Sequence, residues 1–290
     1  MVGLRSNNEV GFLEMVGIAL GDVENHTALH YEAVQTQYIK GTDGDSLRLY
    51  YAGIIAKRAK ELLKISKYMV FDAYFSKKPF VDGLVGQGFT MISRLQSNCY
   101  LRYAYKGVQK GGRGRPKAFD GKIDLKNVST QHFTIIQSNE TEIIYQGMAH
   151  VRALKRWCKL LIVQKLNADG KVKNACAYFC TDTQIEGQKI LQYYQLRFQI
   201  EFLFRDAKQH LGLEDCQARS KEALNFHFNI ALTAGNIAKA LHWYSIPKHQ
   251  RGAFSMADIK TKYTNEMLFD KLITIYDKNP LIEKNNPQIS

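Results

Sequence analysis

The sequence predicts an α/β fold, and three features support this prediction. Short apolar stretches alternate with helical patterns over residues 10–95. A segment from residue 96 to residue 183 contains only short β-rich runs separated by turns, and a long amphipathic helix follows it. Such alternation of strands and helices is typical of a sheet covered by helices. With 290 residues, the chain is long enough to bury a full hydrophobic core.

The N-terminal part begins with two predicted strands, at residues 10–21 and 27–36. A turn that contains Asp22 joins them, so they are expected to form a hairpin. A predicted amphipathic helix follows over residues 47–66, where apolar side chains recur at helical spacing.

Asp72 lies at the end of the next predicted strand, within the apolar stretch YMVFDAYF at residues 68–75. A short helix and the strand FTMISRL, at residues 89–95, follow it. A carboxylate at the end of an apolar strand is costly to bury without a partner. Asp72 is therefore expected either to cap the following helix or to bind a metal ion.

The segment 96–183 has no helical period and predicts an antiparallel, β-rich insertion. One of its loops, KGVQKGGRGRPK at residues 106–117, is rich in glycine and basic residues. Arg113 and Arg115 of this loop could contact DNA phosphates. The GRGRP core also resembles the AT-hook of the minor groove. The alternative is a mobile hairpin loop with solvated charges.

A single helix is predicted from Lys189 to Gly212, with the glycine as its C-terminal cap. One side of it is apolar, and the other carries four polar residues at helical spacing. These are Tyr194, Arg197, Glu201 and Lys208. On an unbroken helix with ~100° per residue they fall within roughly 60° of one another. The alternative for this face is an ordinary solvated surface with ion pairs.

A second long helix is predicted from residue 221 to Pro247, and a weakly helical tail follows over residues 257–276. These elements divide the chain into four parts. They are a first part of the core at 1–95, the insertion at 96–183, a second part of the core at 184–246, and a C-terminal helical tail at 247–290.

Composition narrows the class of function. The net charge is +13 and the pI is near 9.4, which favours a polyanionic partner such as nucleic acid. No apolar run approaches the roughly 18–20 residues that a membrane span needs. The five cysteines are scattered, as in reduced cytoplasmic proteins. The sequence contains no nucleophile elbow, P-loop or dinucleotide fingerprint.

The spacing Tyr-x2-Arg-x3-Glu-x6-Lys, with the flanking text FRDAKQHLGLEDCQARS, resembles the signature of the DDE transposases named after bacterial insertion sequence four. The resemblance also covers the strand that ends at Asp72. It implies a ribonuclease H-like core in which Asp72 and Glu201 are the second and third metal-binding carboxylates. By the same resemblance, Tyr194, Arg197 and Lys208 contact the DNA of the transposon ends.

The implied function is cut-and-paste DNA transposition by a homodimer that binds paired transposon ends in the bacterial cytoplasm. The resemblance implies two Mg²⁺ or Mn²⁺ ions, which in such sites activate a water or a 3′-hydroxyl and stabilise the leaving oxygen.

The chain departs from the family pattern at its start. Counted back from Asp72, the strand that carries the first metal-binding Asp would precede Met1. Asp22 is the acid that could stand in for it, but it lies in the hairpin turn. This departure predicts a truncated transposase that is inactive unless another polypeptide supplies the strand. The alternative function is that of a catalytically inactive remnant that only binds DNA.

Overall fold

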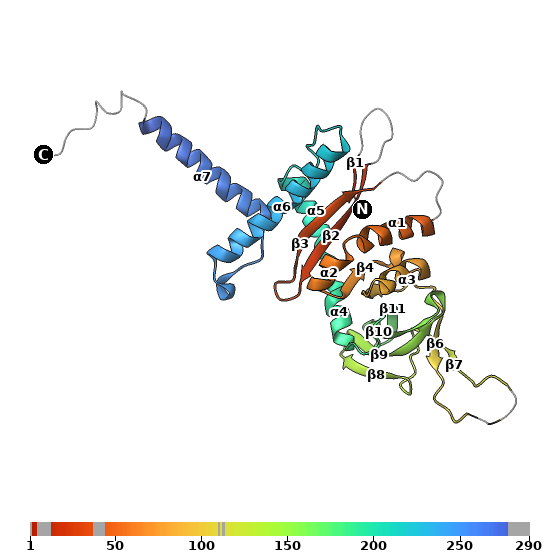
Figure 1. Ribbon diagram of the computed structural model, residues 1–290. Coiled ribbons are helices and arrows are strands. Elements are labelled where there is room, and N and C mark those ends of the chain that lie inside the picture. Colours follow the sequence, from red (N-terminus) through yellow and green to blue (C-terminus); the bar gives the residue numbers. More distant parts are fainter. Residues whose placement is uncertain (1, 5–12, 37–43, 110, 112–113, 278–290) are drawn as a thin grey trace. The chain divides into compact units, whose positions relative to one another are not determined.

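The computed structural model describes residues 2–4, 13–36, 44–109, 111 and 114–277 (Figure 1). Arg113 therefore lies outside the described residues. The chain forms two compact units. Unit 1 consists of Met1–Leu20, Ala28–Thr36 and Glu201–Ser290, and unit 2 consists of Gly21–Thr27 and Gln37–Ile200. The chain combines a mixed sheet with helices, so the predicted α/β class is confirmed.

Unit 2 is built on an eight-stranded sheet in the order β4, β5, β11, β10, β9, β6, β7, with β8 paired to β9. The strands are β4 (Tyr68–Phe71), β5 (Thr90–Arg94), β6 (Leu101–Ala104), β7 (Phe119–Lys122), β8 (Phe133–Ser138), β9 (Glu142–Val151), β10 (Arg156–Leu166) and β11 (Val172–Cys180). β4 and β5 are parallel, and β11 pairs antiparallel with β5. The strands of the segment 96–183 therefore continue the sheet that β4 and β5 begin.

The helices of unit 2 are α1 (Gly44–Ala56), α2 (Ala59–Ile65), α3 (Lys78–Gly86) and α4 (Gly187–Leu196), with 3-10 turns η1 (Ala73–Phe75) and η2 (Arg152–Leu154). The prediction of one helix over residues 47–66 is wrong, because α1 and α2 are separate. Between them the Arg58 N–H donates to the carbonyl of Ile55, only three residues back, at 2.9 Å. This bond tightens the turn and ends the α-helical ladder.

Unit 1 contains strands and helices from both ends of the chain. Its sheet has the order β1, β2, β3, formed by β1 (Val2–Leu4), β2 (Leu13–Asp22) and β3 (Thr27–Gln35). Its helices are α5 (Gln199–His210), α6 (Lys221–Ser245) and α7 (Met256–Asp277), and η3 (Lys248–Gln250) precedes α7. The core includes Met15, Ala28, Leu203, Ala207 and Phe228. None of the helices in the described part of the chain is long and apolar enough to span a bilayer.

Side-chain amides of α6 cover the edge of β3. The Asn236 amide accepts a hydrogen bond from the His30 N–H at 2.8 Å and donates one to the His30 carbonyl at 2.7 Å. Asn229 makes the same pair of bonds with Ala33, both at 2.9 Å. Each amide therefore replaces the peptide group of a neighbouring strand, which satisfies backbone groups that an edge strand would otherwise leave unpaired.

Two further residues extend this pattern along α6. Asn225 accepts from the Gln35 N–H at 3.3 Å, and the buried Lys239 donates to the Ala28 carbonyl at 2.7 Å. Residues four and seven apart lie on one face of a helix, so these side chains meet the strand together. We call Asn225, Asn229 and Asn236 the asparagine ladder.

The predicted single helix from Lys189 to Gly212 is divided into α4 and α5, which corrects that prediction. At the junction, the N–H groups of Arg197 and Phe198 donate to carbonyls three residues back, at 3.1 and 3.2 Å. No Gly or Pro marks the turn, and the apolar period continues through it, so the sequence pattern does not reveal it. The four polar residues of the signature therefore do not share one unbroken helix.

The predicted glycine cap is confirmed at the end of α5. Gly212 has a φ of +68°, and the Leu213 N–H closes the helix by donating to the Ala207 carbonyl at 3.1 Å.

We expect Gly212→Ala to lower the free energy of unfolding by about 1–2 kcal/mol, because a Cβ is strained in the left-handed region. Urea denaturation measures it. The control is Gly86→Ala, since Gly86 is helical and a Cβ added there would meet open space. Equal losses of unfolding free energy in the two variants would contradict the expectation.

Candidate functional site

Asp72 follows β4 at the edge of the unit 2 sheet where two parallel strands end together. Phe71, the last residue of β4, pairs with Ser93 of β5. The buried Ser93 hydroxyl donates to the Asp72 carbonyl at 2.8 Å. Because the carboxyl ends of parallel neighbours meet at the same edge, residues that follow β4 and β5 lie close together. The backbone of Asp72 is thus fixed by the neighbouring strand.

The Asp72 side chain is exposed and caps the short 3-10 turn that follows it. Its Oδ1 accepts a hydrogen bond from the Tyr74 N–H at 2.9 Å, which caps η1. This bond uses one carboxylate oxygen. A carboxylate has further acceptor capacity, so the cap does not prevent Asp72 from binding a cation.

Tyr194 and Arg197 lie at the end of α4, and the Tyr194 phenol interacts electrostatically with the Asp72 carboxylate. The Arg197 guanidinium is 5.8 Å from the centroid of the Tyr194 ring. Burial raises the pKa of the Tyr194 phenol; Arg197 and then Arg94 lower this pKa, and the Asp72 carboxylate raises it. Unit 2 therefore brings two of the predicted DNA-binding residues together, and one of them, Tyr194, lies within electrostatic range of the predicted metal ligand Asp72.

Arg94 and Tyr178 lie beside Tyr194, and the sequence did not identify them as candidate site residues. They pair across β5 and β11, and the rings of Tyr178 and Tyr194 are 4.7 Å apart between centroids. Burial and a hydrogen bond with Cys176 raise the pKa of Tyr178. The only signal for Arg94 was its place at the end of the strand after Asp72. We call Asp72, Arg94, Tyr178, Tyr194 and Arg197 the strand-end cluster.

Glu201 and Lys208 lie on α5, in unit 1. Glu201 is exposed in the first turn of the helix, where a carboxylate interacts favourably with the helix dipole. The Lys208 ammonium forms an ion pair of 2.6 Å with Glu214, and both side chains are partly exposed. Exposed ion pairs of this kind contribute little and can be exchanged for other partners.

The carboxylates have the right chemistry for a hard divalent cation. Mg²⁺ prefers oxygen ligands, and Asp72 and Glu201 both present exposed carboxylates. They belong to different units. Within the described ranges, no three His, Cys, Asp or Glu side chains gather as a metal site.

Asp22 holds a turn. Its Oδ1 accepts from the N–H groups of Glu24 and Asn25 at 3.0 and 3.1 Å, and its Oδ2 accepts from the Asn25 amide at 2.7 Å. Both oxygens are used within four residues of chain, as in an Asx turn. These bonds agree with the expectation that Asp22 lies in the hairpin turn.

The basic loop is closed at its neck. The Gln109 amide donates to the Lys117 carbonyl at 2.7 Å and accepts from the Lys117 N–H at 3.1 Å. Below the neck, Asp120 accepts from the Lys106 N–H at 2.9 Å and contacts the His132 ring at 3.0 Å. Arg115 is exposed on the closed loop.

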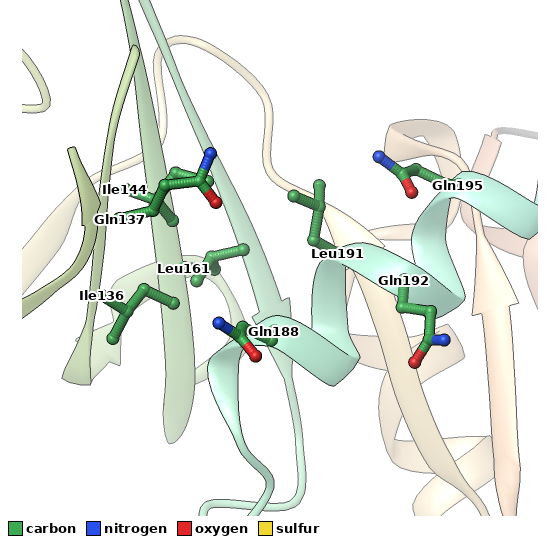
Figure 2. Close-up of a pocket in the computed structure, with 8 residues that line it drawn as sticks. All are labelled: Ile136, Gln137, Ile144, Leu161, Gln188, Leu191, Gln192 and Gln195. Atoms are coloured by element: carbon green, nitrogen blue, oxygen red, sulfur yellow. The ribbon is translucent and has the colours of Figure 1, made fainter. Parts of the chain in front are cut away.

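A pocket of about 160 Å³ lies beside α4 (Figure 2). Gln188, Leu191, Gln192 and Gln195 line it from the helix, and Ile136, Gln137, Ile144 and Leu161 line it from the strands. Figure 2 shows Leu191 and Gln188 pointing from the helix toward the strands. The pocket therefore combines apolar walls with amide groups, on the same helix that carries Tyr194.

Comparison with known proteins gives one result for this chain. A family model described as "Transposase DDE domain" matches residues 55–237, which is more than half of the sequence. The matched region contains Asp72, Glu201 and the other signature residues. None of the curated proteins compared with the chain matches it.

Proposed function

Because this chain belongs to the DDE transposase family, we propose that its transposase function consists of metal-dependent DNA cleavage and strand transfer at transposon ends. The observation that carries the proposal is the strand-end cluster, in which one phenol interacts electrostatically with a carboxylate and with two guanidinium groups. The mixed α/β sheet agrees with the ribonuclease H-like core that the resemblance implies.

In this proposal Asp72 and Glu201 hold Mg²⁺ or Mn²⁺. When bound, a pair of such ions supplies an activated water or 3′-hydroxyl and neutralises the charge on the leaving oxygen. Arg197 and Arg94 place positive charge near the Tyr194 phenol, where they would contact the phosphate of the cleaved strand. Tyr194 is held against Tyr178, so its ring is positioned to stack on a nucleotide.

Arg197, Lys208 and Arg115 are proposed to bind the DNA backbone, together with Tyr194 and with Arg113 outside the described residues. The positive charge of the chain supports DNA as the partner. The assignment of Arg115 is supported by its exposed position on the loop that the Gln109–Lys117 neck closes. Lys208 would exchange Glu214 for a phosphate.

A salt titration tests these contacts. Each phosphate contact contributes about 0.9 to the slope of log K against log salt on duplex DNA. We therefore expect Arg197→Ala and Lys208→Ala each to lower the slope by about 0.9. Fluorescence anisotropy with a labelled duplex, taken from the DNA that flanks the gene, measures it. Lys171→Ala, at an exposed turn position, is the control, and a slope that changes equally in all three variants argues against the assignment.

The function itself is tested with a plasmid that carries the gene and its flanking DNA. The expected result is strand cleavage at fixed positions in the flanking DNA, in Mg²⁺ and not in EDTA. Binding of the same DNA without cleavage would overturn the proposed chemistry and favour the second candidate, a transposase-derived protein that binds DNA without cutting it.

We further propose that the protein acts as a homodimer on paired ends, on DNA in the bacterial cytoplasm. Every residue of α7 from Lys260 to Tyr276 is exposed, including Met267, Phe269 and Leu272. Exposed apolar surface of this kind supports contact with another subunit.

A further inference from the structure

One face of the unit 2 sheet carries a row of basic and aromatic residues that the proposed chemistry does not use. The row crosses four adjacent strands. Lys122 of β7 pairs with Arg102 of β6, Arg102 pairs with His150 of β9, and His150 pairs with Trp157 of β10. Residues directly opposite each other in neighbouring strands project to the same face. The sheet thus aligns four side chains that are distant in the sequence.

A bulge brings Phe119 to the same place. The pairing between β6 and β7 shifts between Arg102 and Ala104, and Gly121 has a φ of +115°, which favours glycine. The Phe119 ring stacks on Trp157 at 5.8 Å with an angle of 30°. The Arg102 guanidinium lies 4.2 Å from the Phe119 centroid. The bulge therefore completes a continuous aromatic surface.

Tyr100 is surrounded by three cations. Arg152, Lys122 and Arg102 lie 5.3, 5.5 and 5.7 Å from its ring centroid. Cation–π contacts of this length hold the charges beside the ring, and Lys122 and Arg152 remain exposed. Tyr100 and Trp157 are each 38% exposed, so both rings remain accessible. We call the residues Tyr100, Arg102, Phe119, Lys122, His150, Arg152 and Trp157 the aromatic–cationic patch.

The patch contains three fixed positive charges and no acidic residue. Burial, and then the nearby charge of Arg102, lower the pKa of His150, which favours a neutral ring. The neighbouring acid, Asp120, is engaged by Lys106 and His132. Arg102 Nε and His150 Nδ1 are buried and have no hydrogen-bond partner among the described residues. The surface is thus complementary to an anion that carries flat rings.

The patch lies on the same face of the sheet as the strand-end cluster. Arg94, Tyr178 and Leu161 form a second row across β5, β11 and β10. Trp157 and Leu161 are four residues apart on β10 and project to the same face, about 13 Å from each other at 3.3 Å per residue. Leu161 is fully buried, so the residue of the second row that one extended ligand could contact together with the patch is the exposed Arg94.

We infer that the aromatic–cationic patch binds an unpaired segment of DNA. Its bases would stack on Trp157 and Tyr100, and its phosphates would contact Arg102, Lys122 and Arg152. Base–aromatic stacking in a basic groove is the usual mode of binding single strands. The inference rests on the proposed function, because DNA as a partner comes from there. A duplex is less well matched, since its bases are not available to stack on a flat aromatic surface.

The two tryptophans, Trp157 and Trp243, allow a direct test. In Trp243→Phe, Trp157 is the single fluorophore. We expect an oligothymidylate of about 15 nucleotides, within the range of single-strand site sizes, to quench its emission in a saturable manner in EDTA. In Trp157→Phe the same titration should leave the emission of Trp243 unchanged. Saturable binding, detected by anisotropy of a labelled oligonucleotide, with no quenching of Trp157 would overturn the inference.

A charge-matched pair of variants provides a second test. Arg102→Gln with Lys122→Gln removes two expected phosphate contacts, and single strands lose about 0.7 in salt slope per contact, so the slope should fall by about 1.4. Lys171→Gln with Lys173→Gln changes two exposed residues near the β10–β11 turn and should not alter it. Circular dichroism verifies that both proteins are folded. Equal slopes in the two variants contradict the inference.

A titration with the flanking duplex separates this inference from the proposed function. Duplex binding and cleavage without oligothymidylate binding would refute the patch and leave the transposase chemistry intact. A protein that binds neither the duplex nor the oligothymidylate would refute both the patch and the proposed function.

Discussion

Asp72→Asn is expected to lower Mg²⁺-dependent DNA cleavage by about 100-fold or more. A metal ligand supports several kcal/mol of charge stabilisation at the reacting phosphate, and each 1.36 kcal/mol is a factor of ten in rate. Asparagine can still accept the hydrogen bond from the Tyr74 N–H that caps η1, so the local fold should persist. The measurement is the initial rate of nicking of the plasmid that carries the flanking DNA.

Glu201→Gln is expected to have an effect of the same size, for the same reason. The controls are Asp169→Asn and Glu186→Gln, which neutralise exposed carboxylates outside the strand-end cluster. Both controls should cleave at the rate of the unchanged protein. Anisotropy with the flanking duplex shows whether DNA binding is retained. Undiminished cleavage by either site variant would rule that residue out as a metal ligand.

The largest expected effect on stability comes from the asparagine ladder. We expect Asn229→Leu to lower the free energy of unfolding by roughly 2–5 kcal/mol. The substitution leaves the N–H and the carbonyl of Ala33 without their partners, and each unsatisfied buried group costs about 1–3 kcal/mol. It also removes the contact between Asn229 and the His30 ring at 3.0 Å. Urea denaturation followed by circular dichroism measures the change.

The matched control for the ladder is Asn265→Leu, which makes the same substitution at an exposed position of α7. Its effect should stay within about 0.5 kcal/mol, as for most surface substitutions. Hydrogen exchange adds a local readout, because the Ala33 amide should lose protection in Asn229→Leu. A loss of stability as small as that of the control would mean that the ladder does not stabilise β3.

The sequence predicted much of the local structure and part of the candidate site. The apolar runs of β4, β5 and β9 to β11, the helical period of α6 and the glycine that ends α5 are all local signals. Asp72 was placed at a strand end for the same reason. The spacing of Tyr194, Arg197, Glu201 and Lys208 indicated the transposase family, which the family match shows. That these four side chains bind metal or DNA stays a prediction.

Other features were decided by contacts between distant segments. The β-rich segment extends the sheet of β4 and β5 through pairing of β11 with β5, and no local pattern encodes that pairing. The turn at Arg197 divides the signature helix without a Gly or Pro to mark it. β7 carries no strand signal of its own, because its four residues FDGK contain a bulged glycine and two charges. In each case the feature depends on contacts between distant segments, and the periodicity of the local sequence does not record those contacts.

The strand-end cluster, the aromatic–cationic patch and the asparagine ladder show the same division. Sequence alone determined that the chain is a basic α/β protein with a transposase signature, because these properties depend on composition and on spacing along one segment. Only the tertiary structure joined Arg94 and Tyr178 to Tyr194, aligned Trp157 with Arg102, and set the amides of α6 against β3. Strand register and side-chain hydrogen bonds fix these neighbours, and both depend on residues that the chain brings together only when it folds.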